Sequence, residues 1–368
     1  MNTKKKIIFL TYIPSPYRVD FFNELNKFSN LFVVYYNKSM LNSGWKNTKK
    51  NHNYKFIYLF DKSKIKGLLK LIKIINNNKD EIFVIGGYSM LAEIISIFYL
   101  RLLGINFILS SDGGFITKGF IKTIIKKKLI KSAKYWLSSG INTSNTLQYY
   151  GAKSSNIFEF HFTSLSKKDI LNELISAKEK NKLKTNANLK TDILYLTYVG
   201  QLIFRKGVDI LIEAISSIKH ENIEVLIIGD GELFSELKAL VKSKGMEKKI
   251  HFLGKQSKIN VLNYLKMSDL FVMPSRDDIW GLVLNEALSI GLPLIASNKV
   301  GSSFNLIHRG INGYIIESGN VNELSNSIDL ICSSDIRSMQ RESLKIAKYY
   351  SIEQMVLDHM VLFNKIDI

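Results

Sequence analysis

Apolar residues along this chain recur in two patterns that alternate from its beginning to its end. Short apolar runs such as DLFVMPS, residues 269–275, close on polar or turn-forming residues. Other stretches place apolar residues three or four positions apart, as at Val208, Leu211, Ile212 and Ile215. The first pattern is typical of buried parallel strands and the second of amphipathic helices. Their alternation predicts doubly wound parallel α/β units.

The length of 368 residues predicts two such units, at roughly 150 residues for each domain. The stretch LSKKDILNELISAKEKNKLKTNANLKTD is charged and poor in strand-forming residues, which favours a connection between domains. We therefore expect a first domain over residues 1–166, a linker over 167–191, a second domain over 192–347 and a C-terminal helix over 348–368.

The stretch PSRDDIWGLVLNEALSIGLPLIAS, residues 274–297, joins a predicted strand to a predicted helix and carries Asp278 and Glu286. A helix that opens at Trp280, Gly281 and Leu282 would point free N–H groups at the preceding loop, which suits a phosphate. Glu286 would lie one to two turns into that helix, where its carboxylate can accept hydrogen bonds from vicinal hydroxyls such as those of a ribose. The alternative is that both acids only complement the helix dipole.

Two adjacent cations follow another predicted strand, in VGQLIFRKGVDILIEA. Gly200 and Gln201 stand at the carboxyl end of the strand, and Arg205 and Lys206 lie in the loop before the next helix. Such a pair can clamp a diphosphate, because Arg supplies a planar fork of donors and Lys a point charge. The alternative is a solvated basic loop.

Two further loops of the same half are candidates for nucleotide contacts. EVLIIGDGELFSELKAL carries Gly229 and Gly231 after a strand, a Rossmann-like pattern that is unspecific without other motifs. IHFLGKQSK places Gly254, Lys255 and Gln256 where backbone groups could meet a base. A purely structural role is an equal alternative for each of these residues.

Together these motifs resemble the retaining glycosyltransferases of family 4, which have the GT-B fold, and the resemblance is strongest from Val199 to about Leu330. In that family an Arg and a Lys hold the nucleotide diphosphate, and Arg205 and Lys206 match them. Two glutamates of the family contact the donor sugar and the ribose. Glu286 matches the second, and Asp278, one methylene shorter, stands in the place of the first. The order Asp-x-Trp-Gly followed by Asn-Glu-Ala resembles the subset found in bacterial capsule and other surface-polysaccharide clusters.

The first half resembles the same family with fewer distinctive positions. KKIIFLTYIPSPYRVDFFNELNKFS is similar to the family's first strand, turn and helix, and the turn supplies acceptor-side candidates: Ser15, Tyr17 and Arg18. Asp112 and Gly113 follow the strand INFILSSDGGF, where Asp112 could contact the acceptor hydroxyl or fix a glycine-rich turn. His161 could face the sugar, although a lone His is more often structural.

The resemblance implies that a sugar passes from a nucleotide diphosphate sugar, most often a UDP-sugar, to a hydroxyl of a glycan or lipid-linked glycan with retention of configuration. The site would lie between the two domains, and the last helix would return to the first domain. No Asp-x-Asp occurs, so neither a metal nor another cofactor is expected, and Arg205, Lys206 and the helix start at Gly281 would take the developing charge. A sugar-nucleotide epimerase or hydrolase, or a non-catalytic nucleotide-binding or scaffold partner, could use the same fold.

The net charge of +19 adds a question about partners. The lysines are spread over many helices and form no known nucleic-acid module, which argues against nucleic acid as the partner. Residues 120–134 and 62–79 place lysines opposite apolar residues, a pattern that can rest on an anionic membrane. The alternative is a helix that covers a sheet and exposes a solvated Lys face.

Three features bear on location. The single cysteine, Cys332, fits a reducing compartment. The apolar run near the start is too short for a signal peptide, and no run approaches about 20 apolar residues. We expect a cytoplasmic protein, either free or peripheral at the inner face of the plasma membrane.

Overall fold

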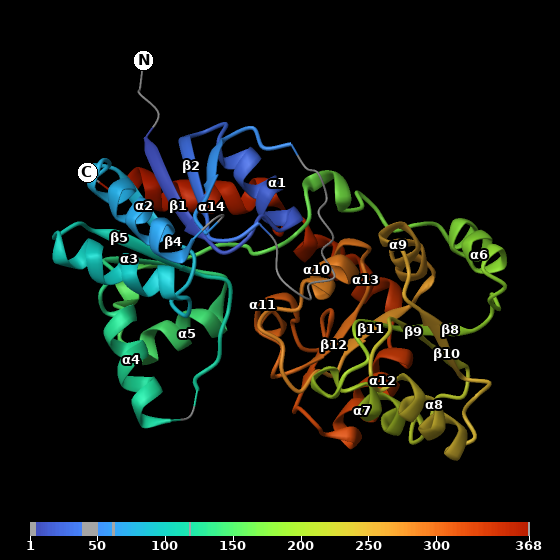
Figure 1. Ribbon diagram of the computed structural model, residues 1–368. Coiled ribbons are helices and arrows are strands. Elements are labelled where there is room, and N and C mark those ends of the chain that lie inside the picture. Colours follow the sequence, from blue (N-terminus) through green and yellow to red (C-terminus); the bar gives the residue numbers. More distant parts are fainter. Residues whose placement is uncertain (1–4, 39–50, 61–62, 118, 367–368) are drawn as a thin grey trace. The chain divides into compact units, whose positions relative to one another are not determined.

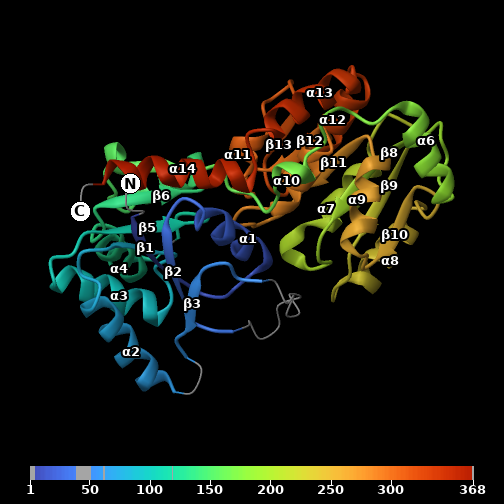
Figure 2. The same ribbon diagram turned by 90° about the horizontal axis from the view of Figure 1, so that it is seen from above.

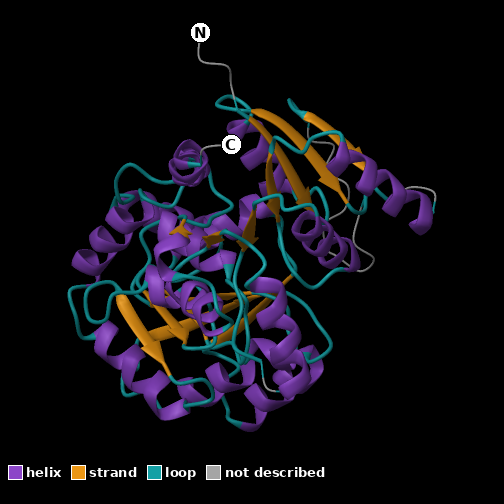
Figure 3. Ribbon diagram, turned by 90° about the vertical axis from the view of Figure 1, so that its left-hand side faces the viewer, coloured by secondary structure: helices purple, strands orange, loops and turns teal. Residues whose placement is uncertain are grey.

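The computed structural model describes residues 5–38, 51–60, 63–117 and 119–366. Contacts divide the chain into two compact units: residues 1–164 with 351–368, and residues 165–350. Each unit is built on one parallel sheet (Figure 1). Figure 3 shows, in separate colours, the helices that flank the strands. Both units are therefore doubly wound α/β structures, as predicted.

The seven strands of the first sheet run in the order β3-β2-β1-β4-β5-β6-β7, and all their pairings are parallel. They are β1 (Lys6–Thr11), β2 (Asn30–Tyr35), β3 (Lys55–Tyr58), β4 (Ile82–Ile85), β5 (Phe107–Ser111), β6 (Tyr135–Ser138) and β7 (Ile157–Glu159). All four residues of β4 are apolar and buried. A continuous apolar strand is what a sheet covered on both faces requires.

Helices cover both faces of the first sheet. On one face α1 (Pro16–Leu25) packs against α14 (Ile352–Lys365). Figure 2 shows α2 (Lys64–Asn76), α3 (Leu91–Leu102) and α4 (Phe120–Ile130) on the side of the strands opposite α14. The unit is completed by α5 (Ile141–Tyr149) and the short 3₁₀ turn η1 (Ser154–Asn156). The layer of α2, α3 and α4 thus faces away from the C-terminal helix.

The C-terminal helix α14 is tied to the first unit by a charged contact and an aromatic cluster. Asp358 Oδ2 accepts a hydrogen bond from the backbone N of His161 at 2.9 Å and lies 2.8 Å from its Nδ1. His359 packs between Phe21 and Phe160, with ring centroids 4.8 Å and 4.6 Å away. Burial lowers the pKa of His359 to about 4, so its imidazole is neutral in this core. The predicted return of the last helix to the first unit is confirmed.

The six strands of the second sheet run in the order β10-β9-β8-β11-β12-β13. They are β8 (Leu194–Val199), β9 (Ile223–Ile228), β10 (Ile250–Gly254), β11 (Leu270–Met273), β12 (Leu294–Ser297) and β13 (Gly313–Ile316). The helices are α6 (Ala177–Asn186), α7 (Val208–Ile215), α8 (Phe234–Ser243), α9 (Lys258–Met267), α10 (Leu282–Ser289), α11 (Ser303–Leu306), α12 (Val321–Cys332) and α13 (Ile336–Ala347), with 3₁₀ turns η2 (Lys167–Asp169) and η3 (Phe204–Lys206). The strand order reverses between β8 and β11, because β9 and β10 extend to one side and β12 and β13 to the other.

Residues 167–191, which we predicted as a linker, lie inside the second unit. The backbone N of Leu171 donates to Ser289 O at 3.0 Å, and Lys180 Nζ donates to Asp269 Oδ1 at 2.5 Å. Lys184 is buried, and its Nζ donates to Ile193 O at 2.7 Å. The charged composition suggested a solvated connection, but tertiary contacts pair these lysines with buried acceptors. The chain passes from one unit to the other at residues 164–165 and 350–351 instead.

None of the helices in the described part of the chain has both the length and the apolar character needed to cross a bilayer.

We predict that Asp358→Ala destabilises the chain by about 1.5–3 kcal/mol, because the hydrogen bonds of its charged carboxylate with His161 and Gln354 are lost. Burial opposes ionisation, but the bonds from His161 outweigh it and lower the pKa of Asp358. The contribution is therefore present above the ordinary carboxyl pKa of about 4 and is lost as the pH falls through the lower folded-state value. Urea unfolding at several pH values measures it, with the exposed Asn364→Ala as the control. Equal unfolding free energies for the two variants at pH 7 would contradict the prediction.

Candidate functional site

The reversal of strand order between β8 and β11 marks the candidate site of the second unit. In open parallel sheets, ligands bind at such a reversal, beyond the carboxyl ends of the strands. The loop 200–207 follows β8, and the loop 274–281 follows β11. These two loops carry the predicted cations and the first predicted acid, so the fold brings Arg205, Lys206 and Asp278 together.

An ion pair joins the two loops. Lys206 Nζ donates to Asp278 Oδ2, and Arg205 Nη1 lies 4.0 Å from the same oxygen. The side chains of Lys206 and Asp278 are only 14% and 15% exposed, whereas that of Arg205 is 42% exposed. Arg205 Nη1 also donates to Asp277 O at 2.7 Å. Two cations beside one carboxylate leave a positive charge at the surface, which suits a ligand that carries phosphate.

The backbone holds Asp278 in place independently of its side chain. Its N–H donates to Lys299 O at 2.8 Å, and its carbonyl accepts from Gly301 N at 3.0 Å. Together these bonds form a parallel bridge between Asp278 and Val300. The carboxylate is therefore positioned by the loop after β12 as well as by its own loop.

Arg276 joins the two loops a second time, although the sequence analysis did not single it out. Its guanidinium donates to Asp209 through two bonds, Nη1 to Oδ1 at 2.8 Å and Nη2 to Oδ2 at 2.5 Å. Nη1 also donates to Phe204 O at 2.9 Å, and the guanidinium carbon lies 4.0 Å from the centroid of the Phe204 ring. Burial alone would raise the pKa of Asp209, but the bonds from Arg276 outweigh it and lower that pKa. The backbone N of Arg276 donates to Arg205 O at 2.8 Å, so this residue positions the cationic loop.

Glu286 lies in the second turn of α10, which begins after a glycine in a left-handed conformation. Gly281 has φ 86°, and a Cβ there would lie 2.8 Å from Val300 Cγ1. Burial raises the pKa of Glu286, and the charge of Lys258, at the start of α9, opposes that shift. Within the residues that the structure describes, no group hydrogen-bonds to the Glu286 carboxylate, so both oxygens can accept bonds from hydroxyls of a ligand.

Trp280 has a structural position, although we predicted it among the binding residues. Its side chain is buried, and its Nε1 donates to Asn285 Oδ1 at 2.9 Å. The indole therefore stabilises the start of α10 from the inside of the unit. Leu282 is the first residue of that helix, at the position we predicted for it.

Glycines bring the loops after β8, β9 and β10 into backbone contact. A Cβ on Gly229 would lie 1.8 Å from Gly200 O, and one on Gly231 would lie 2.4 Å from Leu202 O. The backbone N of Gly229 donates to Gly254 O at 2.9 Å. Only residues without a Cβ allow this approach, so Gly229 and Gly231 are required where these loops come together.

The remaining predicted residues of this unit differ in their surroundings. Gln201 and Lys255 are exposed. The Gln201 carbonyl accepts from Tyr198 Oη at 3.0 Å. Gln256 is engaged within its own turn, since its Nε2 donates to Leu253 O at 2.6 Å and its Oε1 accepts from Asn260 at 3.0 Å.

In the first unit the strand order reverses between β1 and β4, and a second charged pair lies near the carboxyl ends of the strands. Arg18, on α1, forms an ion pair with Asp112, which follows β5. The Arg18 guanidinium lies 5.8 Å from the centroid of the Tyr17 ring, and burial raises the pKa of Tyr17. Ser15 is the buried residue before α1, and the Gly113 carbonyl accepts from Ser111 Oγ at 3.1 Å. Each predicted acceptor-side residue other than His161 thus lies near the carboxyl ends of the strands.

His161 contacts α14 through Asp358, which is the structural alternative that the sequence left open. Sequence reasoning missed Glu93, a buried acid at the start of α3 whose carboxylate accepts from the backbone N of Ser89 at 2.8 Å and of Met90 at 2.9 Å. Burial raises the pKa of Glu93, and the charge of Arg18 opposes the shift. Its place in the first turn of α3, where an acid complements the helix dipole, gives it a structural role that the sequence analysis did not consider.

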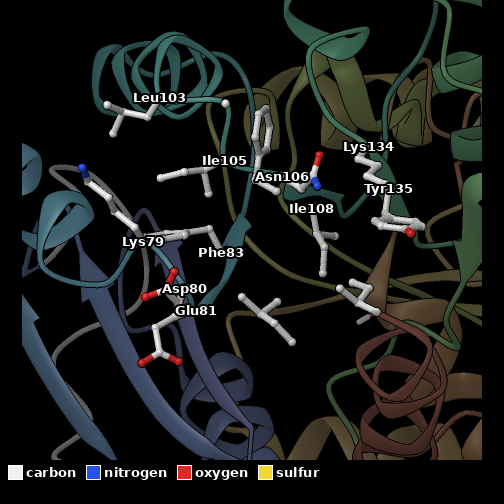
Figure 4. Close-up of a pocket in the computed structure, with 14 residues that line it drawn as sticks. Lys79, Asp80, Glu81, Phe83, Leu103, Ile105, Asn106, Ile108, Lys134 and Tyr135 are labelled. Carbon is white, nitrogen blue, oxygen red and sulfur yellow. The ribbon is translucent and has the colours of Figure 1, made fainter. Parts of the chain in front are cut away.

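A hollow of about 330 Å³ lies near the amino ends of strands in the first sheet (Figure 4). Its lining includes Glu81, Phe83 and Ile108, near the amino ends of β4 and β5. It is therefore separate from the carboxyl ends of the strands, where Asp112 lies. Among the described residues, no three His, Cys, Asp or Glu side chains gather in a way that could hold a metal ion.

Residues 179–350 match the family model of the glycosyl transferases group 1, and that stretch contains Arg205, Lys206, Asp278 and Glu286. This part of the chain belongs to that family. An uncharacterized glycosyltransferase of Methanocaldococcus jannaschii is 32% identical over 162 residues, which are 44% of this chain and 45% of that protein. The UDP-Gal:alpha-D-GlcNAc-diphosphoundecaprenol alpha-1,3-galactosyltransferase of Escherichia coli is 27% identical over 308 residues, 79% of this chain and 77% of that one. The chain spans about half the length of the first curated relatives it matches.

The similarity to solved structures extends over both units of the chain. HepE of Anabaena, in complex with UDP, superposes with a TM-score of 0.80 and 14% identity, over 98% of this chain and 100% of that one. At this identity the similarity shows the fold, which is GT-B. The predicted fold is confirmed, and the model of the predicted family matches residues 179–350.

We predict that Arg276→Lys destabilises the second unit by about 1–2 kcal/mol, because an ammonium cannot reproduce the two parallel bonds to Asp209. The variant Arg341→Lys is the matched control, since Arg341 is exposed and lies 3.8 Å from Asp335. In a double-mutant cycle with Asp209→Asn, measured by urea unfolding, the two losses should be strongly non-additive. Additive losses would mean that the pair does not join the loops.

We predict that Glu286→Gln stabilises the chain at neutral pH. Since burial raises the folded-state pKa of Glu286, the ionised form destabilises the fold above that pKa, and the neutral amide removes this effect. The gain in melting temperature should shrink as the pH falls toward the ordinary carboxyl pKa of about 4. Thermal melts from pH 4 to pH 8 measure it against the exposed Glu247→Gln. A variant that melts below the parent protein at pH 8 would show that the carboxylate supports the fold.

Proposed function

We propose that the chain transfers a sugar from a nucleotide diphosphate sugar to a hydroxyl of a glycan or lipid-linked glycan, with retention of anomeric configuration. The observation that carries the proposal is the meeting of Arg205 and Lys206 with Asp278 at the strand reversal, where α10 then presents Glu286. Two cations and one acid on adjacent loops, with a second acid on the helix that follows, fit a ligand that carries anionic phosphates and hydroxyl groups.

Each side chain has a role in the proposed reaction. Arg205 and Lys206 take the charge that develops on the departing diphosphate, with the backbone N–H groups at the start of α10. Asp278 accepts a hydrogen bond from a donor-sugar hydroxyl, and Glu286 accepts bonds from the ribose. The departing phosphate takes the proton of the acceptor hydroxyl on the same face of the sugar. The reaction then needs no side-chain nucleophile and no metal.

Two relatives support the substrate classes. The Escherichia coli relative is named for UDP-Gal and for a diphosphoundecaprenol-linked acceptor, and HepE of Anabaena was solved with UDP. A UDP-sugar is therefore the proposed donor and a lipid-linked glycan the proposed acceptor, within bacterial surface-polysaccharide synthesis. On the acceptor side, Asp112 would accept a hydrogen bond from the incoming hydroxyl, with Arg18 holding its carboxylate in place.

We predict that UDP raises the melting temperature of the parent protein and that Lys206→Ala weakens UDP binding about 10-fold to 100-fold, by the loss of one charge-assisted contact. A ligand at 100 times its dissociation constant stabilises a fold by about 2.7 kcal/mol, which a thermal shift detects readily. The exposed Lys242→Ala is the matched control. UDP, GDP and CDP, each free and as sugar conjugates, form the panel.

Turnover assays, read together with the thermal shifts, separate the proposed function from its alternatives. Incubation with a UDP-sugar and a diphosphate-linked lipid acceptor should give a glycosylated lipid whose new bond keeps the donor's anomeric configuration, which NMR reads directly. Release of free sugar without transfer would favour a hydrolase, and a changed sugar would favour an epimerase. Nucleotide binding without turnover on any acceptor would favour a scaffold. No shift with any nucleotide would exclude the donor site itself.

A further inference from the structure

Helix α4 of the first unit carries an apolar surface that nothing in the described chain covers. Phe120, Ile121, Ile124 and Ile125 are 81%, 72%, 50% and 51% exposed. They occupy neighbouring positions on one side of the helix, at spacings of one and four residues. We call these four residues the α4 face. Figure 1 shows α4 in teal, with its first turns directed away from the strands of its own unit.

The last turn of α4 attaches the helix to the unit. Leu129 and Ile130, in its last turn, are its buried residues and join the core that includes Leu100 and Leu147. A helix that only covered the sheet would bury its apolar side and expose its lysines. In α4 most of the apolar residues point outward instead, so the sheet-covering alternative considered from the sequence does not describe this helix.

The charge around the α4 face has one sign. Helices α2 and α4 contain eight lysines and no acid, and the acid of α3, Glu93, is buried. The first unit as a whole has 26 Lys and Arg against 11 Asp and Glu, whereas the second has 25 against 21. Most of the net charge of the chain, +15 of +19, therefore belongs to the unit that exposes this apolar surface.

The neighbouring helices extend the same surface. Helices α2 and α4 both contact α3, and the three lie on one side of the first sheet (Figure 2). Exposed apolar residues continue across them: Ile65 and Leu69 of α2, and Leu91, Phe98 and Leu102 of α3. Lys128 Nζ lies 5.5 Å from the centroid of the Phe98 ring, so lysine stems and apolar groups are interleaved. Apolar groups surrounded by lysines are the composition that binds an anionic bilayer, where lysines meet headgroups and apolar side chains enter the acyl boundary.

We infer that the α4 face docks the first unit onto a bilayer that contains anionic lipid. Exposed Phe and Ile contribute little to a contact with nucleic acid, whose affinity depends on phosphates, and an acidic protein partner would leave them unpaired. The docking surface goes beyond the proposed transfer reaction and does not depend on it, because no residue of the donor site takes part.

Vesicle co-sedimentation of the full chain tests the inference. The chain should bind vesicles of phosphatidylcholine with phosphatidylglycerol, bind phosphatidylcholine alone poorly, and lose binding as salt increases. Ile121→Ser with Ile124→Ser should weaken partitioning at least about tenfold, since two exposed side chains no longer enter the acyl boundary. Ile259→Ser with Leu330→Ser is the matched control, because both residues are exposed on the second unit. All four positions are solvent-facing, so unchanged melting temperatures should accompany the loss.

Two further measurements separate local docking from general charge attraction. Lys122→Glu with Lys127→Glu should weaken binding strongly, whereas Lys182→Glu with Lys248→Glu, an equal change in net charge on the second unit, should have little effect. In Phe120→Trp the added fluorescence should be quenched by brominated lipid, and that of Ile259→Trp should not. Equal binding by the α4 variants and their controls would overturn the inference. So would a chain dimer that Ile121→Ser with Ile124→Ser dissociates in sedimentation velocity, since a second copy would then be the occupant.

Discussion

The ion pair between Lys206 and Asp278 is the contact around which the second unit is organised. It joins the loop after β8 to the loop after β11, the two strands between which the order of the sheet reverses. A partly buried pair of this kind gains little stability by itself, because removing both charges from water offsets their attraction. Its surroundings compensate: the backbone of the 299–301 stretch fixes Asp278, and Arg276 fixes the cationic loop against Asp209. The charges are thus held in place before any ligand arrives, and preorganised charge is what makes a site effective in stabilising a developing anion.

The same arrangement explains which parts of the site could be predicted from the sequence. The alternation of strands and helices was visible. Arg205, Lys206 and Asp278 stood in loops after strands, where a parallel sheet binds its ligands, and Glu286 stood in the helix that follows one of these loops. The fork between Arg276 and Asp209 could not be predicted, because it requires β8 and β11 to be neighbours although 67 positions separate the two residues. Trp280 stood inside a motif, but its burial depends on how α10 packs, which local sequence does not specify.

Composition was a poor guide where tertiary contacts decided the outcome. The charged stretch 167–191 was predicted to be a linker, yet Lys180 and Lys184 donate hydrogen bonds to acceptors in the second unit. Helix α4 was correctly predicted to be amphipathic, but periodicity states only that two sides differ. How much of the apolar side is buried depends on where the helix is attached, and here the buried residues of the helix are confined to Leu129 and Ile130, in its last turn.

The two units distribute their charge differently, and the proposed substrates give a reason. A nucleotide donor dissolved in water is small, so two cations placed at one strand reversal suffice to hold its phosphates, and the rest of the second unit can be nearly neutral. A lipid-linked acceptor is confined to a surface. A unit that rests on that surface meets the acceptor at a raised effective concentration, without a deep pocket for the lipid chain. Broad positive charge and shallow apolar contacts serve this purpose better than a few precise bonds, because a fluid bilayer offers no fixed partner atoms. The dense contacts around Asp278 then suit a small nucleotide donor, and the exposed α4 face suits a bilayer.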